Sequence, residues 1–119
     1  MSIAKLKDLK KVSYFVIIAC MTKAKDIENP VLQESYEELC SLISKIQDEE
    51  TLKEVFSCLF TGNERKALTE RWQIVKELTA GTTQREIAKK YNMSLCKITR
   101  GSKELQKPDC GFKKLLALR

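Results

Sequence analysis

Residues 84–107 read QREIAKKYNMSLCKITRGSKELQK, and this stretch decides the fold. Its pattern predicts two short helices, one ending near Tyr91 and one running from Leu95 to about Leu105. Asn92 can take the left-handed backbone conformation that a tight turn between them requires. Ala88 has the small side chain that lets a second helix cross closely. Together these features predict a helix-turn-helix, a unit that DNA-binding proteins place in the major groove.

The composition of this predicted unit suits nucleic acid. Seven Lys and Arg against two Glu give residues 84–107 a net charge of +5, which is enough to contact several phosphates. A plain helical hairpin with a solvated basic face is the alternative interpretation. Four apolar residues are expected to fix the two helices to the core: Ile87, Tyr91, Met93 and Ile98.

The rest of the chain also predicts helices. Apolar residues recur every three or four positions after Pro30, which is typical of one buried helix face. Asp48 can cap a second helix, and a Thr61–Glu64 capping box opens a third, which Gly81 ends. We therefore expect an all-α fold of about six helices. The predicted organisation is an N-terminal extension or arm over residues 1–30, a single domain over 31–119 with its helix-turn-helix at 84–107, and a last short helix containing Phe112, Leu115 and Leu116.

The N-terminal stretch differs from the remainder. Residues 1–25 carry a net charge of +5, and the apolar run at 12–21 is ten residues long. Such a run is too short to cross a bilayer, which needs about 20 residues. A signal peptide is an alternative interpretation of this stretch, but no small-residue cleavage site follows it. Met21 offers a second plausible start.

Composition excludes several classes of function. The 119 residues correspond to one domain. The chain has no histidine, which removes His-containing catalytic triads and zinc sites, and we expect neither catalytic residues nor a metal. The five cysteines have no closely spaced pair, which indicates free thiols in a reducing cytosol. Each internal cysteine is expected to be a small buried hydrophobe. We therefore expect a cytoplasmic protein that is not an enzyme and has no membrane partner.

Several segments together resemble the tryptophan repressor family over about residues 31–107. They are Asn63-Glu64-Arg65-Lys66-Ala67-Leu68, Arg71, Gln84-Arg85-Glu86 and Ile98-Thr99-Arg100-Gly101-Ser102. The resemblance implies an intertwined homodimer with a shared helical core and two helix-turn-helix reading heads. It also implies that L-tryptophan binds as corepressor between core and head, with no further cofactor.

The resemblance assigns site residues on this chain. Arg71 and Arg100 would sandwich the indole ring, and backbone carbonyls near Cys58 and Phe60 would receive the ammonium group. Thr61 and Gly101 would lie along the same pocket, and so would Glu104, where the best-known members carry a small hydroxyl residue. Contacts to double-stranded operator DNA would come from Gln84, Arg85, Ala88, Leu95, Cys96, Lys97 and Thr99.

The predicted function is a sequence-specific repressor of tryptophan biosynthesis genes, activated by L-tryptophan. The alternative is a regulator of the same fold that needs no ligand or a different one, and Glu104 is the residue that keeps this open. A helical adaptor that binds an acidic protein or a membrane is a third possibility, which the basic and apolar N-terminal stretch would favour.

Overall fold

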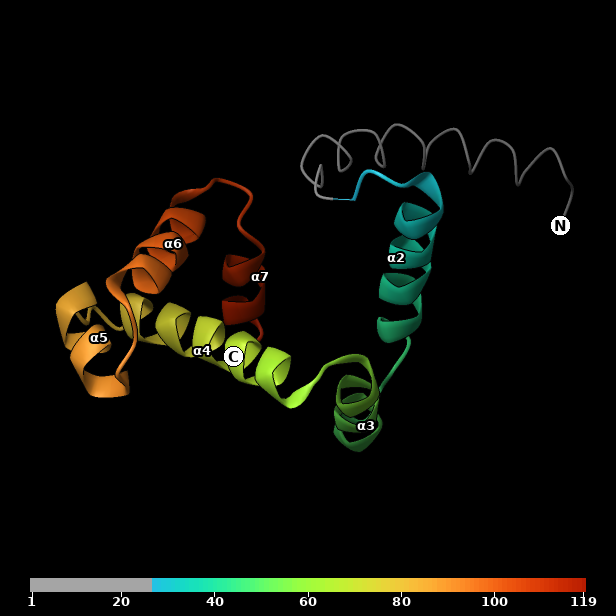
Figure 1. The fold of residues 1–119 in the computed structure, drawn as a ribbon, viewed down its shortest axis with the longest axis horizontal. Helices are drawn as coiled ribbons and strands as arrows, with labels where there is room; N and C mark the ends of the chain where they lie inside the picture. Colours follow the sequence, from blue (N-terminus) through green and yellow to red (C-terminus); the bar gives the residue numbers. More distant parts are fainter. Residues whose placement is uncertain (1–26) are drawn as a thin grey trace, which may run out of the picture. The chain divides into compact units, whose positions relative to one another are not determined.

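The structure is a computed structural model that describes residues 27–119. These residues form six helices and no strand (Figure 1), as the sequence predicts. The helices are α2 (Pro30–Ile43), α3 (Glu49–Leu59), α4 (Gly62–Thr79), α5 (Gln84–Tyr91), α6 (Leu95–Gln106) and α7 (Gly111–Ala117). The chain divides into two compact units, Met1–Thr51 and Leu52–Arg119. No helix among residues 27–119 is long and apolar enough to cross a membrane.

The predicted N-terminal arm, with its apolar run and alternative start, lies almost wholly outside the described residues. The first described helix, α2, begins with Asn29, whose side chain accepts from the Val31 amide, and has Pro30 in its first turn. No residue of α2 is buried, and the exposed residues include Leu32 and Tyr36. The apolar face predicted from periodicity is therefore present, with Leu32 and Tyr36 exposed and Leu39 and Ile43 half-buried. The single domain predicted for residues 31–119 stays a prediction.

The helices α3, α4, α5 and α6 begin at the caps that the sequence predicts, whereas α7 begins after Cys110 without a side-chain cap. The Asp48 carboxylate accepts a hydrogen bond from the Thr51 amide at 2.8 Å. The Thr61 hydroxyl accepts from the Glu64 amide at the start of α4, while Glu64 accepts from the Thr61 amide. Such reciprocal caps satisfy amides that have no partner within the helix. These local bonds explain why the helix starts follow from sequence alone.

A tight turn joins α5 to α6. Thr83 and Glu86 form a capping box at the start of α5, and Ser94 caps α6. Asn92 lies between the helices with φ 51°, in the left-handed region. Gly81 ends the preceding helix with φ 88°, which glycine adopts without steric cost. The two helices predicted within residues 84–107 are thus confirmed.

The core that holds α4, α5 and α6 together is small. Ile74, Ile87 and Ile98 form one buried cluster with one residue from each helix. Three elements that pack on one another bury the faces that none could bury alone. Around this cluster lie Leu78, Ala88, Tyr91 and Met93. The four residues expected to fix the pair of helices are therefore either in the cluster or packed against it.

Glu77 anchors α5 to α4 by polar contacts. Its carboxylate accepts hydrogen bonds from the ammonium group of Lys90 at 2.8 Å, from the hydroxyl of Tyr91 and from the hydroxyl of Thr82 at 2.8 Å. The Glu77 side chain is only 12% exposed. These donors hold the pKa of Glu77 at about 2, with the bond from Lys90 contributing most. The carboxylate is therefore ionised near neutral pH and ties three segments together.

The described cysteines are free, as expected, but their burial differs from the prediction. Cys110, before α7, is buried, whereas Cys40, Cys58 and Cys96 are exposed. The expectation of burial was wrong for these three in the single chain. Cys96 is exposed because it lies in the first turn of α6, beyond the buried Ile98 face.

Candidate ligand pocket and nucleic-acid interface

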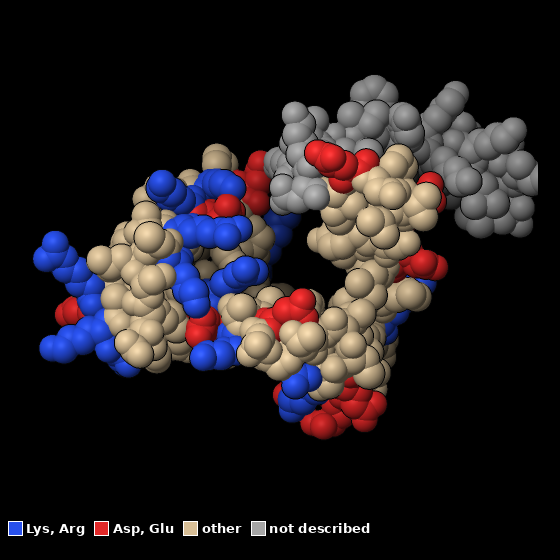
Figure 2. All heavy atoms as spheres, viewed as in Figure 1, with Lys and Arg blue, Asp and Glu red and all other residues tan. Residues whose placement is uncertain are grey.

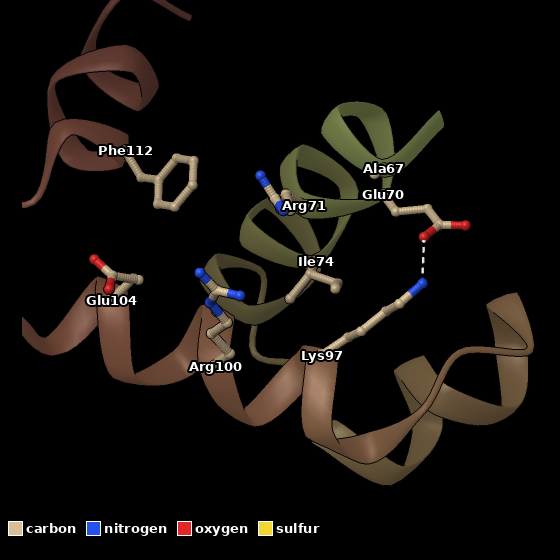
Figure 3. Close-up of a pocket in the computed structure, with 9 residues that line it drawn as sticks. Ala67, Glu70, Arg71, Ile74, Lys97, Arg100, Glu104 and Phe112 are labelled. Carbon is tan, nitrogen blue, oxygen red and sulfur yellow. Dashed lines mark hydrogen bonds and ion pairs between the residues drawn. The ribbon is translucent and has the colours of Figure 1, made fainter. Parts of the chain in front are cut away.

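Two facing stripes of side chains, one on α4 and one on α6, build a cavity (Figure 3). Its volume is about 350 Å³, within the range of about 300–1,000 Å³ that is typical of small-molecule sites. Residues three or four apart share one helix face. The lining follows that spacing: α4 contributes Ala67, Glu70, Arg71 and Ile74, α6 contributes Lys97, Arg100, Gly101 and Glu104, and α7 adds Phe112.

The two helices come close together at Gly101. A Cβ atom on this residue would lie 2.9 Å from Cγ2 of Ile74, which is nearer than carbon atoms approach without strain. Ile74 is only 2% exposed, so it is fixed by its neighbours. Gly101 lines the pocket as expected, and its lack of a side chain is what lets α6 approach α4.

Arg71 and Arg100 line this cavity from opposite helices. Figure 3 shows both guanidinium groups at the middle of the cavity, Arg71 from α4 and Arg100 from α6. Neither makes a hydrogen bond or ion pair with any residue in 27–119. The cavity therefore contains two planar cations that have no partner among these residues, and the predicted contact of this pair with a ligand stays a prediction.

The cavity also contains an ion pair that sequence reasoning missed. The Lys97 ammonium group donates to Oε2 of Glu70 at 2.9 Å, which joins α6 to α4. This hydrogen bond holds the pKa of Glu70 below its usual value. Lys97 was predicted to contact DNA, and here its ammonium group lies on the pocket side. The ammonium group has two further N–H donors, and its contact with DNA stays a prediction.

Glu104 lines the cavity at the end opposite Glu70 (Figure 3). Its Oε1 accepts a hydrogen bond from the Lys107 ammonium group at 2.6 Å. Glu104 is therefore a cavity-lining carboxylate with one neighbouring cation, and its contact with a ligand stays a prediction. No group of three or more potential metal ligands comes together among the described residues.

Helical spacing in the sequence indicates some of the pocket residues, whereas nothing in the sequence indicates Phe112. Ala67 and Ile74 lie four before and three after Arg71, and Lys97 lies three before Arg100. Helical spacing from the two arginines could have identified them. Phe112 reaches the cavity from α7, and its position depends on how the chain turns after α6.

Three predicted ligand residues do not line the cavity of the single chain. Cys58 and Phe60 lie at the end of α3 and just beyond it, and Thr61 caps α4. The Thr61 hydroxyl donates to Glu64 at 2.9 Å. Thr61 therefore has a structural role as the cap of α4. The contribution of these residues to ligand binding stays a prediction.

The predicted DNA-contacting residues lie on α5 and the first turns of α6. Arg85, Leu95 and Cys96 are exposed. The Thr99 hydroxyl donates to Oε1 of Gln84 at 2.9 Å, so two predicted contact residues orient each other across the helices. Ala88 is half-buried and packs on the isoleucine cluster. Its role in helix packing is thus confirmed, while DNA contact by these residues stays a prediction.

Positive charge gathers on this part of the molecule. Residues 84–119 carry ten Lys and Arg against three Asp and Glu. On the face drawn in Figure 2, basic side chains cluster over α5 and α6. A surface of this sign attracts a polyanion and increases its rate of association.

Comparisons with known proteins agree on one family. The family described as Trp repressor protein matches residues 34–118. A Trp operon repressor homolog of Chlamydia trachomatis is 40% identical over 85 residues, which make up 71% of this chain and 90% of the relative. A homolog of the same name from Chlamydia caviae is 44% identical over 80 residues, covering 66% and 76%. One from Xylella fastidiosa is 33% identical over 75 residues, covering 62% and 82%. No solved structure matches significantly.

Proposed function

We propose that L-tryptophan is the corepressor of this protein, which belongs to the Trp repressor family and is a DNA-binding transcriptional repressor. The genes it represses are then those of tryptophan biosynthesis. The observation that carries the proposal is that Arg71 and Arg100, whose guanidinium groups have no partner within residues 27–119, line one cavity. Guanidinium planes stack on aromatic rings with cation–π attraction. A guanidinium group also binds a carboxylate with two hydrogen bonds.

The remaining lining suits an aromatic amino acid. Ala67, Ile74 and Phe112 offer apolar surface to a ring, and burying that surface is favourable. The ligand ammonium group would meet the carboxylate of Glu104. Backbone carbonyls near Cys58 and Phe60 would complete the ammonium site from the second chain of a homodimer.

Binding of such a ligand would set the position of α6. Arg71 belongs to α4 and Arg100 to α6, so a molecule held between them bridges the core helix and the proposed DNA-reading helix. A ligand shifts a conformational equilibrium only by its difference in affinity for the two states. Tryptophan would therefore favour the orientation in which both arginines contact it, and the same orientation would bind the operator.

The α5–α6 pair is proposed as the DNA-reading head. Arg85 and the exposed first turn of α6 would contact the operator, with Gln84 and Thr99 held in register by their mutual hydrogen bond. Two heads related by a two-fold axis would meet half-sites about one helical turn apart, roughly 34–36 Å. Affinity should fall with rising salt, because each phosphate contact releases counterions.

A homodimer is part of this proposal. The exposed apolar residues of α2 and α3 include Leu32, Leu42 and Leu59, and neither helix has a buried residue. Such uncovered apolar surface is the usual mark of a protein–protein interface.

The second candidate is a repressor of the same fold that needs no ligand. The observation that favours it is the Glu70–Lys97 ion pair, because this pair already joins α4 to α6. In that case α6 would have its DNA-binding orientation in the empty protein.

The test is calorimetric titration of the purified protein with each of the twenty amino acids, followed by operator binding with and without the best ligand. Arg71→Ala should abolish tryptophan binding and the ligand dependence of operator affinity. Arg85→Ala is the matched control, since the same substitution on the exposed face of α5 should weaken DNA binding and leave ligand binding unchanged. Operator affinity of the wild type that is unchanged by millimolar tryptophan would favour the ligand-independent repressor.

A further inference from the structure

Among residues 27–119, no side chain donates a hydrogen bond to Oε1 of Glu70, which lines the cavity. Its Oε2 accepts from Lys97 at 2.9 Å, but the next cation, the 76% exposed Lys66, is 3.9 Å from Oε1. A distance of 3.9 Å is too long for a hydrogen bond. Glu70 is only 20% exposed and lines the pocket. A ligand that reaches this end of the cavity therefore meets an oriented oxygen with free lone pairs.

The two ends of the cavity are lined by different side chains, and this difference would orient a ligand. Figure 3 shows Glu104 and Phe112 at one end, the Glu70–Lys97 pair at the other, and the two arginines between them. An amino acid that gives its carboxylate to an arginine and its ammonium group to Glu104 must direct its ring towards Glu70. A ring donor buried there without an acceptor would lose its hydrogen bond to water, which is costly.

We propose that Glu70 accepts a hydrogen bond from a donor on the ligand ring, so that the pocket selects aromatic amino acids with a ring N–H or O–H over those with none. This inference rests on the proposed function and adds a specificity-determining residue to it. Lys97 acts on the same contact as a positioning residue, because its ion pair holds the carboxylate in place.

The charge on Glu70 makes this selection strong. Its lowered pKa keeps the carboxylate ionised near neutral pH, and an ionised carboxylate can only accept. Hydrogen bonds to charged groups contribute about twice as much as neutral ones. Loss of the ring donor should therefore weaken binding about tenfold or more.

The experiment compares L-tryptophan with L-benzothienylalanine, in which a ring sulfur replaces the N–H and little else changes. Calorimetric titration of both ligands gives a ratio of dissociation constants for each variant. The wild-type ratio should be about ten or more. It should fall to about one in Glu70→Met, which removes the acceptor, and should fall only part of the way towards one in Lys97→Met, which keeps the carboxylate but removes the ion pair that positions it.

Glu104→Met is the matched control, because it removes the same group from the opposite end of the same cavity. It should weaken both ligands by a similar factor and leave their ratio unchanged. If circular dichroism shows that Glu70→Met is unfolded, Glu70→Gln replaces it. The ratio of dissociation constants in Glu70→Gln should be lower than in the wild type because the charge is gone.

Three results would overturn the proposal. A wild-type ratio of one would mean that the ring donor meets no acceptor, while tryptophan binding itself would leave the proposed function standing. A ratio of dissociation constants that falls to one in Glu104→Met but keeps its wild-type value in the Glu70 variant would mean that the ligand lies in the reverse orientation. Absence of tryptophan binding to the wild type would overturn this inference and the proposed function together.

Discussion

Replacing Gly101 by alanine tests whether the close contact of α6 with α4 shapes the pocket. The new Cβ would lie 2.9 Å from Cγ2 of Ile74, whereas carbon atoms in contact rest about 3.5–4.0 Å apart. Ile74 is buried, and its branched side chain is stiff. The helices must therefore separate by about 0.5–1 Å, which would move Arg100 relative to Arg71.

Two opposing effects set the size of the change in stability. Alanine in place of glycine inside a helix is favourable by about 1 kcal/mol. Overpacking of a closely packed contact costs about 1–3 kcal/mol. The expected result for Gly101→Ala is a net loss of about 0–2 kcal/mol of unfolding free energy, together with weaker ligand binding.

Gly101→Ala should stabilise the protein rather than destabilise it once Cγ2 of Ile74 is removed. Cβ of Ile74 would lie 3.9 Å from the new methyl group, which is an ordinary contact. In an Ile74→Ala background, Gly101→Ala should therefore stabilise the protein by about 1 kcal/mol through helix propensity. A coupling of this kind is what a double-mutant cycle measures.

The assay is urea unfolding followed by circular dichroism, with the four proteins at one fixed concentration because dimerisation would add to stability. Calorimetry with the ligand then reports on the pocket. The reasoning fails if Gly101→Ala gains the full propensity term of about 1 kcal/mol in both backgrounds, since the contact with Ile74 would then have no effect.

Three further predictions concern the anchor, the turn and the interface. Glu77 has its pKa lowered to about 2 from an ordinary value of 4.5. Its stabilising effect is therefore present above pH 4.5 and lost as the pH falls towards 2, and urea unfolding of Glu77→Gln should depend less steeply on pH in that window. Asn92→Ala should lower stability in a thermal scan by about 1 kcal/mol because of its left-handed conformation, whereas Asn92→Gly should not. Leu32→Lys should shift the protein towards monomer in sedimentation, while Glu34→Lys, on another side of α2, should leave the dimer intact.

The helix starts and the tight turn could be predicted from sequence because their causes are local. The Thr83 capping box needs only Glu86 three residues on, and Asn92 needs only its own tolerance of positive φ. The sequence likewise predicted Arg71 and Arg100 in one cavity, although that rested on a family resemblance rather than on spacing. The caps and the turn depend only on nearby residues, whereas the shared cavity of Arg71 and Arg100 depends on how α4 and α6 pack.

The Glu70–Lys97 pair and Phe112 could not be predicted, because both depend on how helices cross. The two members of the pair are 27 residues apart in the chain. Their contact exists because Gly101 lets α6 approach α4 closely. Phe112 reaches the cavity through the turn after Gln106, whose direction no capping residue or spacing rule indicates. The family resemblance assigned Lys97 to DNA, and its contact with Glu70 adds a second partner.

The ion pair between Glu70 and Lys97 is too exposed to fix α6 on its own. The Lys97 side chain is 58% exposed, and water and salt screen such a pair. A ligand between Arg71 and Arg100 would bridge the same two helices through two guanidinium groups, so it would favour one orientation of α6 more strongly. The pair then has a different use, because it orients a carboxylate at the end of the cavity where a ring donor would lie. On this reasoning, the ion pair contributes to the choice of ligand, and the ligand sets the orientation of α6.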